Sequence, residues 1–110
     1  MIQIIAEPLE FSLKDRTNFK VGLKAKNIGN RIIETKLYET ALLVNGEPSL
    51  AWNLAISNGV RDESWWNLKP EETVTASWHL GEALFLQPGE YNILLRYGSQ
   101  DSSVRVRVTP

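Results

Sequence analysis

The side chains that could take part in catalysis are few and scattered in this sequence. His79 is the single imidazole, and it follows Ser77 by two residues in a run that alternates apolar and polar side chains. A serine nucleophile needs a general base within hydrogen-bond reach and a carboxylate that orients this base. The residues around His79 offer no such acid and no nucleophile elbow. We therefore interpret His79 as a surface histidine.

Acidic residues and glycines also lack the spacing of a ligand site. The adjacent pairs Asp62-Glu63 and Glu71-Glu72 do not alternate around a glycine, as the ligands of a calcium loop do. No glycine pattern resembles a phosphate-binding loop. The absence of cysteine excludes disulfides, thiolate metal sites and thiol catalysis. The sequence thus predicts no cofactor, no metal site and no enzymatic activity.

The four tryptophans carry the strongest functional signal. Trp78 lies on the apolar face of an expected strand, so we predict that it is the central aromatic residue of the core. Trp65 and Trp66 are neighbours, and neighbouring residues of a strand face opposite sides, so both cannot enter one core. Exposed tryptophan beside polar groups is typical of interaction hot spots. We predict a partner contact at Arg61, Trp65 and Trp66; a tryptophan lid over one end of the fold is the alternative.

Length and composition indicate one globular domain that spans residues 1–110. Hydrophobic residues make up 43% of the chain and charged residues 23%, which is close to the globular average. The formal net charge of -1 argues against nucleic acid as a partner, because proteins that bind a duplex usually carry a basic excess. Residues 14–36 are locally basic and residues 39–90 locally acidic. This asymmetry fits a mixed solvated surface, and its alternatives are a docking surface steered by charge complementarity or head-to-tail association between copies.

No stretch has the roughly 20 apolar residues that cross a bilayer, so we expect no membrane insertion. The first ten residues lack the basic start and the apolar run of a signal peptide. We therefore expect a cytoplasmic protein, or an extracellular domain if the chain was cut from a secreted parent. The oligomeric state stays open.

The dominant period of the sequence is two, which predicts strands with one buried face. It occurs in four runs: residues 19–26, 74–80, 91–97 and 104–108. Residues 2–6 and 9–13 fit an edge strand that Pro8 interrupts, because proline cannot donate a ladder hydrogen bond. Asn, Gly and Pro separate the runs, which favours a sandwich or barrel.

Two segments are harder to interpret. Residues 38–44 fit a strand, but Leu37 is out of phase with Leu42 and Val44, which predicts a β-bulge near residues 39–40. In residues 49–57 every second residue from Leu50 onward is apolar, which favours a strand. Ser49 also fits the N-cap of a two-turn helix. We prefer the strand and keep the helix as the alternative.

Several ordered motifs resemble immunoglobulin-like sandwiches. Residues 86–91, Leu-Gln-Pro-Gly-Glu-Tyr, resemble the corner that leads into the sixth strand of such folds, where a Tyr hydroxyl bonds to an upstream backbone group. The resemblance assigns this structural role to Tyr91. Residues 26–30, 43–48, 68–74, Trp78 and 88–91 follow one another as in the cell-adhesion-related domain found in bacteria. Residues 41–44 through 91 are also similar to the bacterial intracellular proteinase inhibitors, which share a longer middle segment with this chain.

These resemblances imply an all-β, immunoglobulin-like (Greek-key) β-sandwich of about seven strands. Neither family implies a catalytic residue. The favoured function is a non-catalytic module that binds another protein through the segment around Trp65 and Trp66. An intracellular proteinase inhibitor is the first alternative. A carbohydrate-binding module is the second, since a flat indole ring can stack on a sugar.

Overall fold

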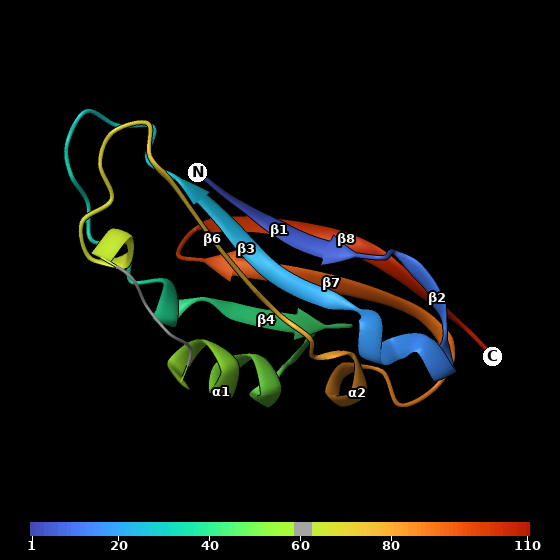
Figure 1. Cartoon of the computed structure of the whole chain (residues 1–110). Coiled ribbons are helices and arrows are strands. Elements are labelled where there is room, and N and C mark those ends of the chain that lie inside the picture. Colours follow the sequence, from blue (N-terminus) through green and yellow to red (C-terminus); the bar gives the residue numbers. More distant parts are fainter. Residues whose placement is uncertain (59–62) are drawn as a thin grey trace.

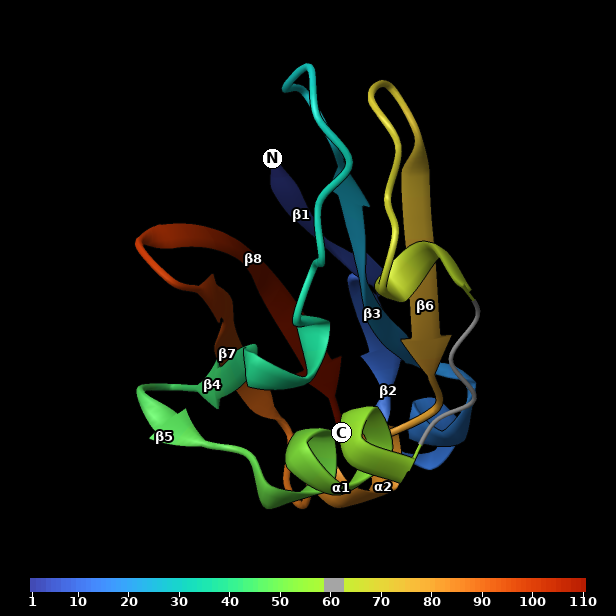
Figure 2. The same ribbon diagram turned by 90° about the vertical axis from the view of Figure 1, so that its left-hand side faces the viewer.

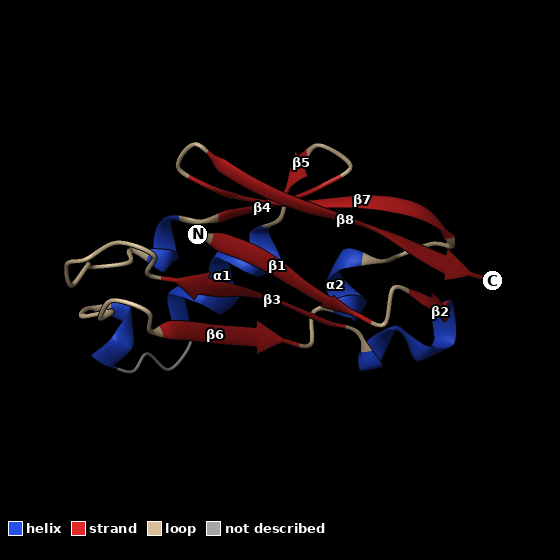
Figure 3. Ribbon diagram, turned by 90° about the horizontal axis from the view of Figure 1, so that it is seen from above, coloured by secondary structure: helices blue, strands red, loops and turns tan. Residues whose placement is uncertain are grey.

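Alternating apolar and polar residues form the strands of two sheets in the computed structural model, which describes residues 1–58 and 63–110. The first sheet has the order β1-β3-β6 and the second the order β2-β8-β7-β4-β5. The two sheets lie as two layers (Figures 1 and 3). The strands are β1 (Ile2–Glu7), β2 (Glu10–Ser12), β3 (Lys20–Lys26), β4 (Ala41–Val44), β5 (Glu47–Pro48), β6 (Thr73–Trp78), β7 (Gly89–Tyr97) and β8 (Gln100–Thr109).

The described residues thus hold eight strands and few helical segments, which confirms a strand-rich fold with two sheets. The four period-two runs of the sequence correspond to β3, β6, β7 and β8. In the described residues, five short helical segments lie between the strands. They are the 3-10 helices η1 (Leu13–Asn18), η2 (Leu37–Glu39) and η3 (Glu63–Trp65), and the α-helices α1 (Leu50–Asn58) and α2 (Gly81–Leu84).

The core lies between the two layers and contains the inward side chains of both. Strand β3 and the residue before it contribute Phe19, Val21 and Leu23, and all three are fully buried. The rings of Phe11, Phe19 and Phe85 pack together with centroids 4.9–5.5 Å apart. Alternation along the strands therefore predicts which side chains form the core.

Pro8 separates two strands that belong to different sheets. β1 pairs antiparallel with β3 in the first sheet, and β2 pairs parallel with β8 in the second. Each strand forms an edge of its sheet. The expected edge strand interrupted by Pro8 is confirmed, and the interruption is where the chain passes from one layer to the other.

The preference for a strand at residues 49–57 is wrong, because this segment forms helix α1. The Ser49 hydroxyl accepts a hydrogen bond from the Trp52 amide at 3.2 Å, which is the N-cap interaction of the alternative reading. Trp52 and Ile56, four residues apart, are buried on one side of the helix. Leu50 and Leu54 are exposed, so the alternation of apolar residues in this segment does not predict which side chains are buried in the core.

The expected β-bulge near residues 39–40 is also wrong. Lys36 adopts a left-handed conformation with φ 52°, and the chain then makes the 3-10 turn η2 before β4 begins. The Thr40 hydroxyl closes this turn by donating to the Leu37 carbonyl at 2.7 Å. A helical turn thereby brings Leu37 into the core without any disturbance of the strand pairing.

Candidate functional site

Two long loops project from one end of the molecule and lie side by side (Figures 1 and 2). We call residues 27–38 and 63–72 the two-loop arm. Ile33 and Leu68 form an antiparallel bridge, in which the two amides donate to the opposite carbonyls at 3.0 and 2.8 Å. The amide and hydroxyl of Thr35 both donate to the Trp65 carbonyl, at 3.1 and 2.8 Å. The arm is therefore a bonded structure and not a pair of independent loops.

Asn27 is the central polar side chain of the arm. It is 3% exposed, and its amide nitrogen donates to the carbonyls of Arg31 at 2.7 Å and Leu68 at 2.8 Å. Its side-chain oxygen accepts from the Gly29 amide at 2.9 Å. A buried side-chain amide with three hydrogen bonds fixes the surrounding backbone, because every bond lost would leave a polar group unsatisfied.

The base of the arm is tied to both sheets. The backbones of Asn27 and Glu71 bond where the arm joins the first sheet, with the Glu71 amide donating at 2.8 Å. From the second sheet, the Tyr97 hydroxyl donates to the carbonyl of Thr35. Burial, and to a lesser extent the carboxylate of Glu39, raises the pKa of the Tyr97 hydroxyl. Tyr97 therefore stays a neutral donor over the usual pH range.

Large apolar side chains are exposed at several positions along this arm. It carries five of the ten large exposed hydrophobic residues that the described part of the chain contains. Their exposed fractions are 66% for Ile28, 58% for Ile32, 40% for Ile33, 36% for Tyr38 and 42% for Trp66. The rings of Tyr38 and Trp66 lie 6.4 Å apart at their centroids. We call these five side chains the arm patch.

The prediction that Trp65 and Trp66 cannot both enter the core is confirmed. Trp65 is 3% exposed and belongs to the core, whereas Trp66 is 42% exposed. The two side chains diverge because η3 ends at Trp65, and not because they alternate along a strand as the sequence suggested. One indole of the pair thus reaches the surface. Arg61, the third predicted contact residue, lies outside the described residues.

Sequence reasoning missed Ile28, Ile32, Ile33 and Tyr38. Ile28 stands among residues that favour turns, in Asn27-Ile28-Gly29-Asn30. The sequence did contain one sign of these surface residues: apolar residues of high β-propensity occur in a long connection between strands, and such connections are usually polar. The strand pattern on either side gave no reason to place them on the surface.

The two predicted structural residues lie near the ends of β6 and β7. Trp78 is only partly buried and packs edge-on against Trp52 at 5.4 Å. The expectation that it is the central core aromatic is therefore wrong, because Trp52 from α1 occupies that position and is fully buried. The Tyr91 hydroxyl donates to the Gln87 carbonyl at 2.6 Å. This bond closes the connection that leads from the first sheet to the second.

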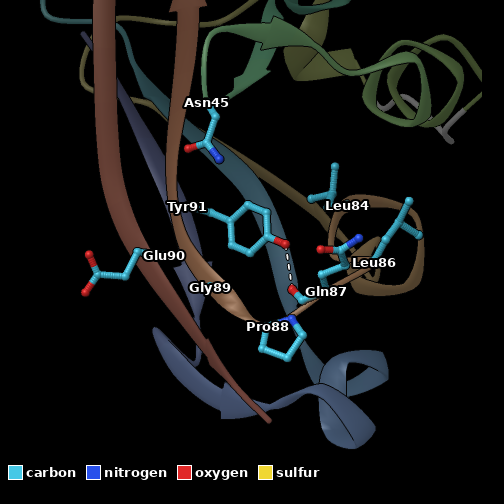
Figure 4. A pocket seen from close by; sticks show the side chains of 8 residues that line it. All are labelled: Asn45, Leu84, Leu86, Gln87, Pro88, Gly89, Glu90 and Tyr91. Carbon is cyan, nitrogen blue, oxygen red and sulfur yellow. Dashed lines mark hydrogen bonds between the residues drawn. The ribbon is translucent and has the colours of Figure 1, made fainter.

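The same connection borders an open groove of about 370 Å³ (Figure 4). The start of β7, where the groove lies, is at the end of the molecule away from the arm (Figure 1). Asn45, Gln87 and Tyr91 are polar residues of the groove wall, whereas the side chain of Glu90, also a lining residue, points away from Tyr91 (Figure 4). Leu86, 74% exposed, borders the groove as well. The lining residues of the groove include one carboxylate, of Glu90, and one phenol, of Tyr91, and the phenol is bonded to the Gln87 carbonyl.

Of the groups considered as candidates for chemistry, Glu63, Glu71 and Glu72 belong to the arm, whereas His79 lies outside both the arm and the groove. His79 is exposed, as predicted, just after the end of β6. Among residues 1–58 and 63–110, no three His, Asp or Glu side chains come close enough together to hold a metal ion. Within the same residues, none of the helices is both long enough and apolar enough for a membrane span.

Comparison of the chain with protein-family models and with curated proteins finds no match. The arm patch is accordingly described by its own geometry: an apolar, partly aromatic surface on a hydrogen-bonded projection.

Proposed function

We propose that this chain is a non-catalytic protein-interaction module of immunoglobulin-like fold that binds another protein through the arm patch. The observation that carries the proposal is the collection of five large apolar side chains on the projecting arm. Exposed apolar side chains that lie close together, as the rings of Tyr38 and Trp66 do, are typical of protein-interaction sites. Tyrosine and tryptophan are also enriched among the residues that dominate binding energy.

Three features support the immunoglobulin-like assignment. The strand order is β1-β3-β6 in one sheet and β2-β8-β7-β4-β5 in the other. The first strand is divided between the two sheets at Pro8, with its second part parallel to the last strand. Tyr91 resembles the tyrosine corner of such folds, because it lies near the start of the strand before the last and its hydroxyl donates to the carbonyl of Gln87, four residues upstream.

The rigidity of the arm supports binding as much as its composition does. A loop that must be ordered on binding loses part of its interaction energy to that ordering. The hydrogen bonds of Asn27 and Thr35 link the two loops of the arm to each other and restrain their backbones. The apolar side chains are therefore presented by a fixed backbone, as in preorganised binding loops.

A quantitative pull-down from extracts of the source cells tests the proposal. Immobilised wild-type protein is compared with Ile32→Ser and Trp66→Ser, each of which removes one exposed apolar side chain of the arm. Leu86→Ser is the matched control, because Leu86 is also exposed and lies at the opposite end. We expect both arm variants to lose a discrete partner that the control retains. Equal retention by all four proteins would exclude the arm patch as the contact.

An inhibitor of an intracellular proteinase is the second candidate, and the projection of the arm favours it. Enzyme clefts are reached by loops that extend beyond the body of a domain, and the arm is such an extension, braced by the Ile33–Leu68 bridge. Titration of a panel of serine proteinases with the purified domain separates the two candidates. Inhibition that Ile32→Ser abolishes would identify an inhibitor; absence of inhibition at micromolar concentration would leave the interaction module.

A further inference from the structure

The two sheets have four edge strands in the described part of the chain, and three of these are protected. β5 has two residues, one of them Pro48. β2 has three residues and follows Pro8 closely. On the outer side of β1, the amides of Ile2 and Ile4 donate to the side-chain oxygens of Gln100 and Ser102, at 3.2 and 3.0 Å. Short length, proline and coverage by side chains are the usual means by which proteins block strand edges.

The fourth edge strand, β6, has none of these protections among residues 1–58 and 63–110. It is six residues long, and its sequence Thr-Val-Thr-Ala-Ser-Trp contains no charge, no proline and no glycine. Among the described residues, no strand pairs with β6 on the side away from β3. An uncharged edge of this length, rich in residues of high β-propensity, is a ready template for another strand.

The hydrogen bonds of the first sheet show which backbone groups face outward. The Asn27 amide donates to the Glu72 carbonyl at 3.1 Å, one step beyond the paired residues Lys26 and Thr73. Along an antiparallel pair, residues that bond to the partner alternate with residues that point away from it. Because Glu72 bonds towards β3, the N–H and C=O groups of Thr73, Thr75 and Ser77 point away from it.

We propose that this open edge of β6 pairs with the β6 edge of a second copy of the chain, in an antiparallel arrangement centred on Thr75. A two-fold axis at Thr75 pairs it with itself and pairs Thr73 with Ser77 of the other copy. Each of these three pairs exchanges two N–H···O bonds, so that all the outward groups of β6 are used. An axis at Val74 would leave Ser77 without a strand partner, and an axis at Ala76 would pair Thr73 with His79, which lies beyond the strand.

The side chains favour a second copy as the occupant. The side chains of Thr73, Thr75 and Ser77 are exposed on one face, and opposite threonine and serine side chains hydrogen-bond favourably across strands. No charges meet along the pairing, because β6 has none. Glu72 precedes the strand and His79 follows it, so the antiparallel arrangement sets the acidic end of one copy beside the imidazole end of the other.

Sedimentation velocity tests the assembly. We expect the mass of the wild-type protein to rise from 12.5 kDa towards twice that value as the concentration goes from about 10 μM to about 1 mM, as for a weak interface. Thr75→Lys sets two ammonium groups against each other at the axis and should keep the protein monomeric. Ser103→Lys, at an exposed position of β8, is the matched control and should behave like the wild type.

A cysteine at the axis tests the register, since the chain has no other cysteine. Directly opposed residues of a hydrogen-bonded antiparallel pair have Cα atoms about 5.5 Å apart, which lies within the range of disulfides. Thr75→Cys should therefore form a disulfide-linked dimer much faster than Ser103→Cys. Equal rates for the two variants would mean random collision and would overturn the proposal.

Amide hydrogen exchange separates a second copy from other occupants of the edge. We expect the Thr73, Thr75 and Ser77 amides to become protected as the protein concentration rises. Protection that is the same at all concentrations would mean that the chain covers its own edge, and protection that appears only with a foreign peptide would mean another partner. Either result, or a wild-type protein that stays monomeric throughout, would overturn the proposal.

Discussion

Replacing Asn27 with alanine should loosen the arm selectively. The substitution removes two donated hydrogen bonds, to the carbonyls of Arg31 and Leu68, and one accepted bond, from the Gly29 amide. Each hydrogen bond contributes about 1 kcal/mol net, so the free energy of unfolding should fall by about 3 kcal/mol. The contribution from Leu68 to this loss should be the smaller one, because the Leu68 carbonyl also accepts a hydrogen bond from the Ile33 amide at 3.0 Å and keeps that bond in the variant.

Urea unfolding combined with amide hydrogen exchange measures both the size and the place of the effect. In Asn27→Ala the Ile33 and Leu68 amides should exchange by local opening, much faster than the amides of β7 and β8. Asn30→Ala is the matched control, because Asn30 is an exposed residue of the same loop and its replacement should change stability by less than about 0.5 kcal/mol. A loss below about 1 kcal/mol in Asn27→Ala, with unchanged protection of the arm, would refute the role of Asn27.

Three further predictions concern the core, the tryptophan pair and Tyr97. Gly22→Ala should lower the free energy of unfolding, measured in urea, by about 1–3 kcal/mol or more, because the new Cβ would lie 2.0 Å from the Ala76 carbonyl oxygen. In the control Gly29→Ala the new Cβ meets its nearest atom at 3.4 Å, so the stability should stay near that of the wild type. Equal stabilities of the two variants would contradict this prediction. Trp65→Ala should lower the free energy of unfolding by about 3–5 kcal/mol, and Trp66→Ala, at the exposed position, by about 1 kcal/mol or less. A larger loss of thermal stability in Trp66→Ala than in Trp65→Ala would be incompatible with the burial of Trp65 and the exposure of Trp66. The pKa of Tyr97 is raised in the folded state, so its hydroxyl ionises at a lower pH in the unfolded chain than in the folded one. The neutral hydroxyl therefore contributes stability in full below about pH 10, and this contribution is lost as the pH rises through the folded pKa. The urea midpoint of the wild type should therefore fall relative to Tyr97→Phe between about pH 8 and pH 11, and a constant difference would count against the reasoning.

The strands and most of the core could be predicted from the sequence because their signal is local. In β3 and β8 the alternation of apolar and charged residues predicts which face of each strand is buried. Pro8 also predicted correctly where the first strand is interrupted, since a missing N–H acts at one position. The strand-rich, two-sheet architecture follows from these features.

The helix α1 could not be predicted with the same success, because its pattern fits two periods. Leu50, Trp52, Leu54 and Ile56 alternate as in a strand, yet Trp52 and Ile56 are also four residues apart as on a helix. The choice depends on contacts made elsewhere. The Trp52 indole N–H donates to the Thr40 hydroxyl at 3.2 Å, and its ring packs against Trp78.

The arm could be predicted only at Trp66, for a related reason. The hydrogen bonds of the arm join residues that are far apart in the sequence, as in the Ile33–Leu68 bridge. No periodic pattern in the sequence predicts such pairs. Asn27 looks like an ordinary turn residue in the sequence. Its importance comes from burial and from bonds to two separate loops, which only the folded chain creates.

Site-specific photo-crosslinking tests most directly whether the arm patch is a binding surface. A photoreactive residue is placed at position 32 in one variant and at position 86 in another, both of which replace exposed apolar side chains. In the source cells we expect position 32 to yield one discrete adduct with another protein, which Trp66→Ser in the same chain abolishes, and position 86 to yield none. Adducts of the same kind from both positions, or none from position 32, would contradict a partner contact at the arm.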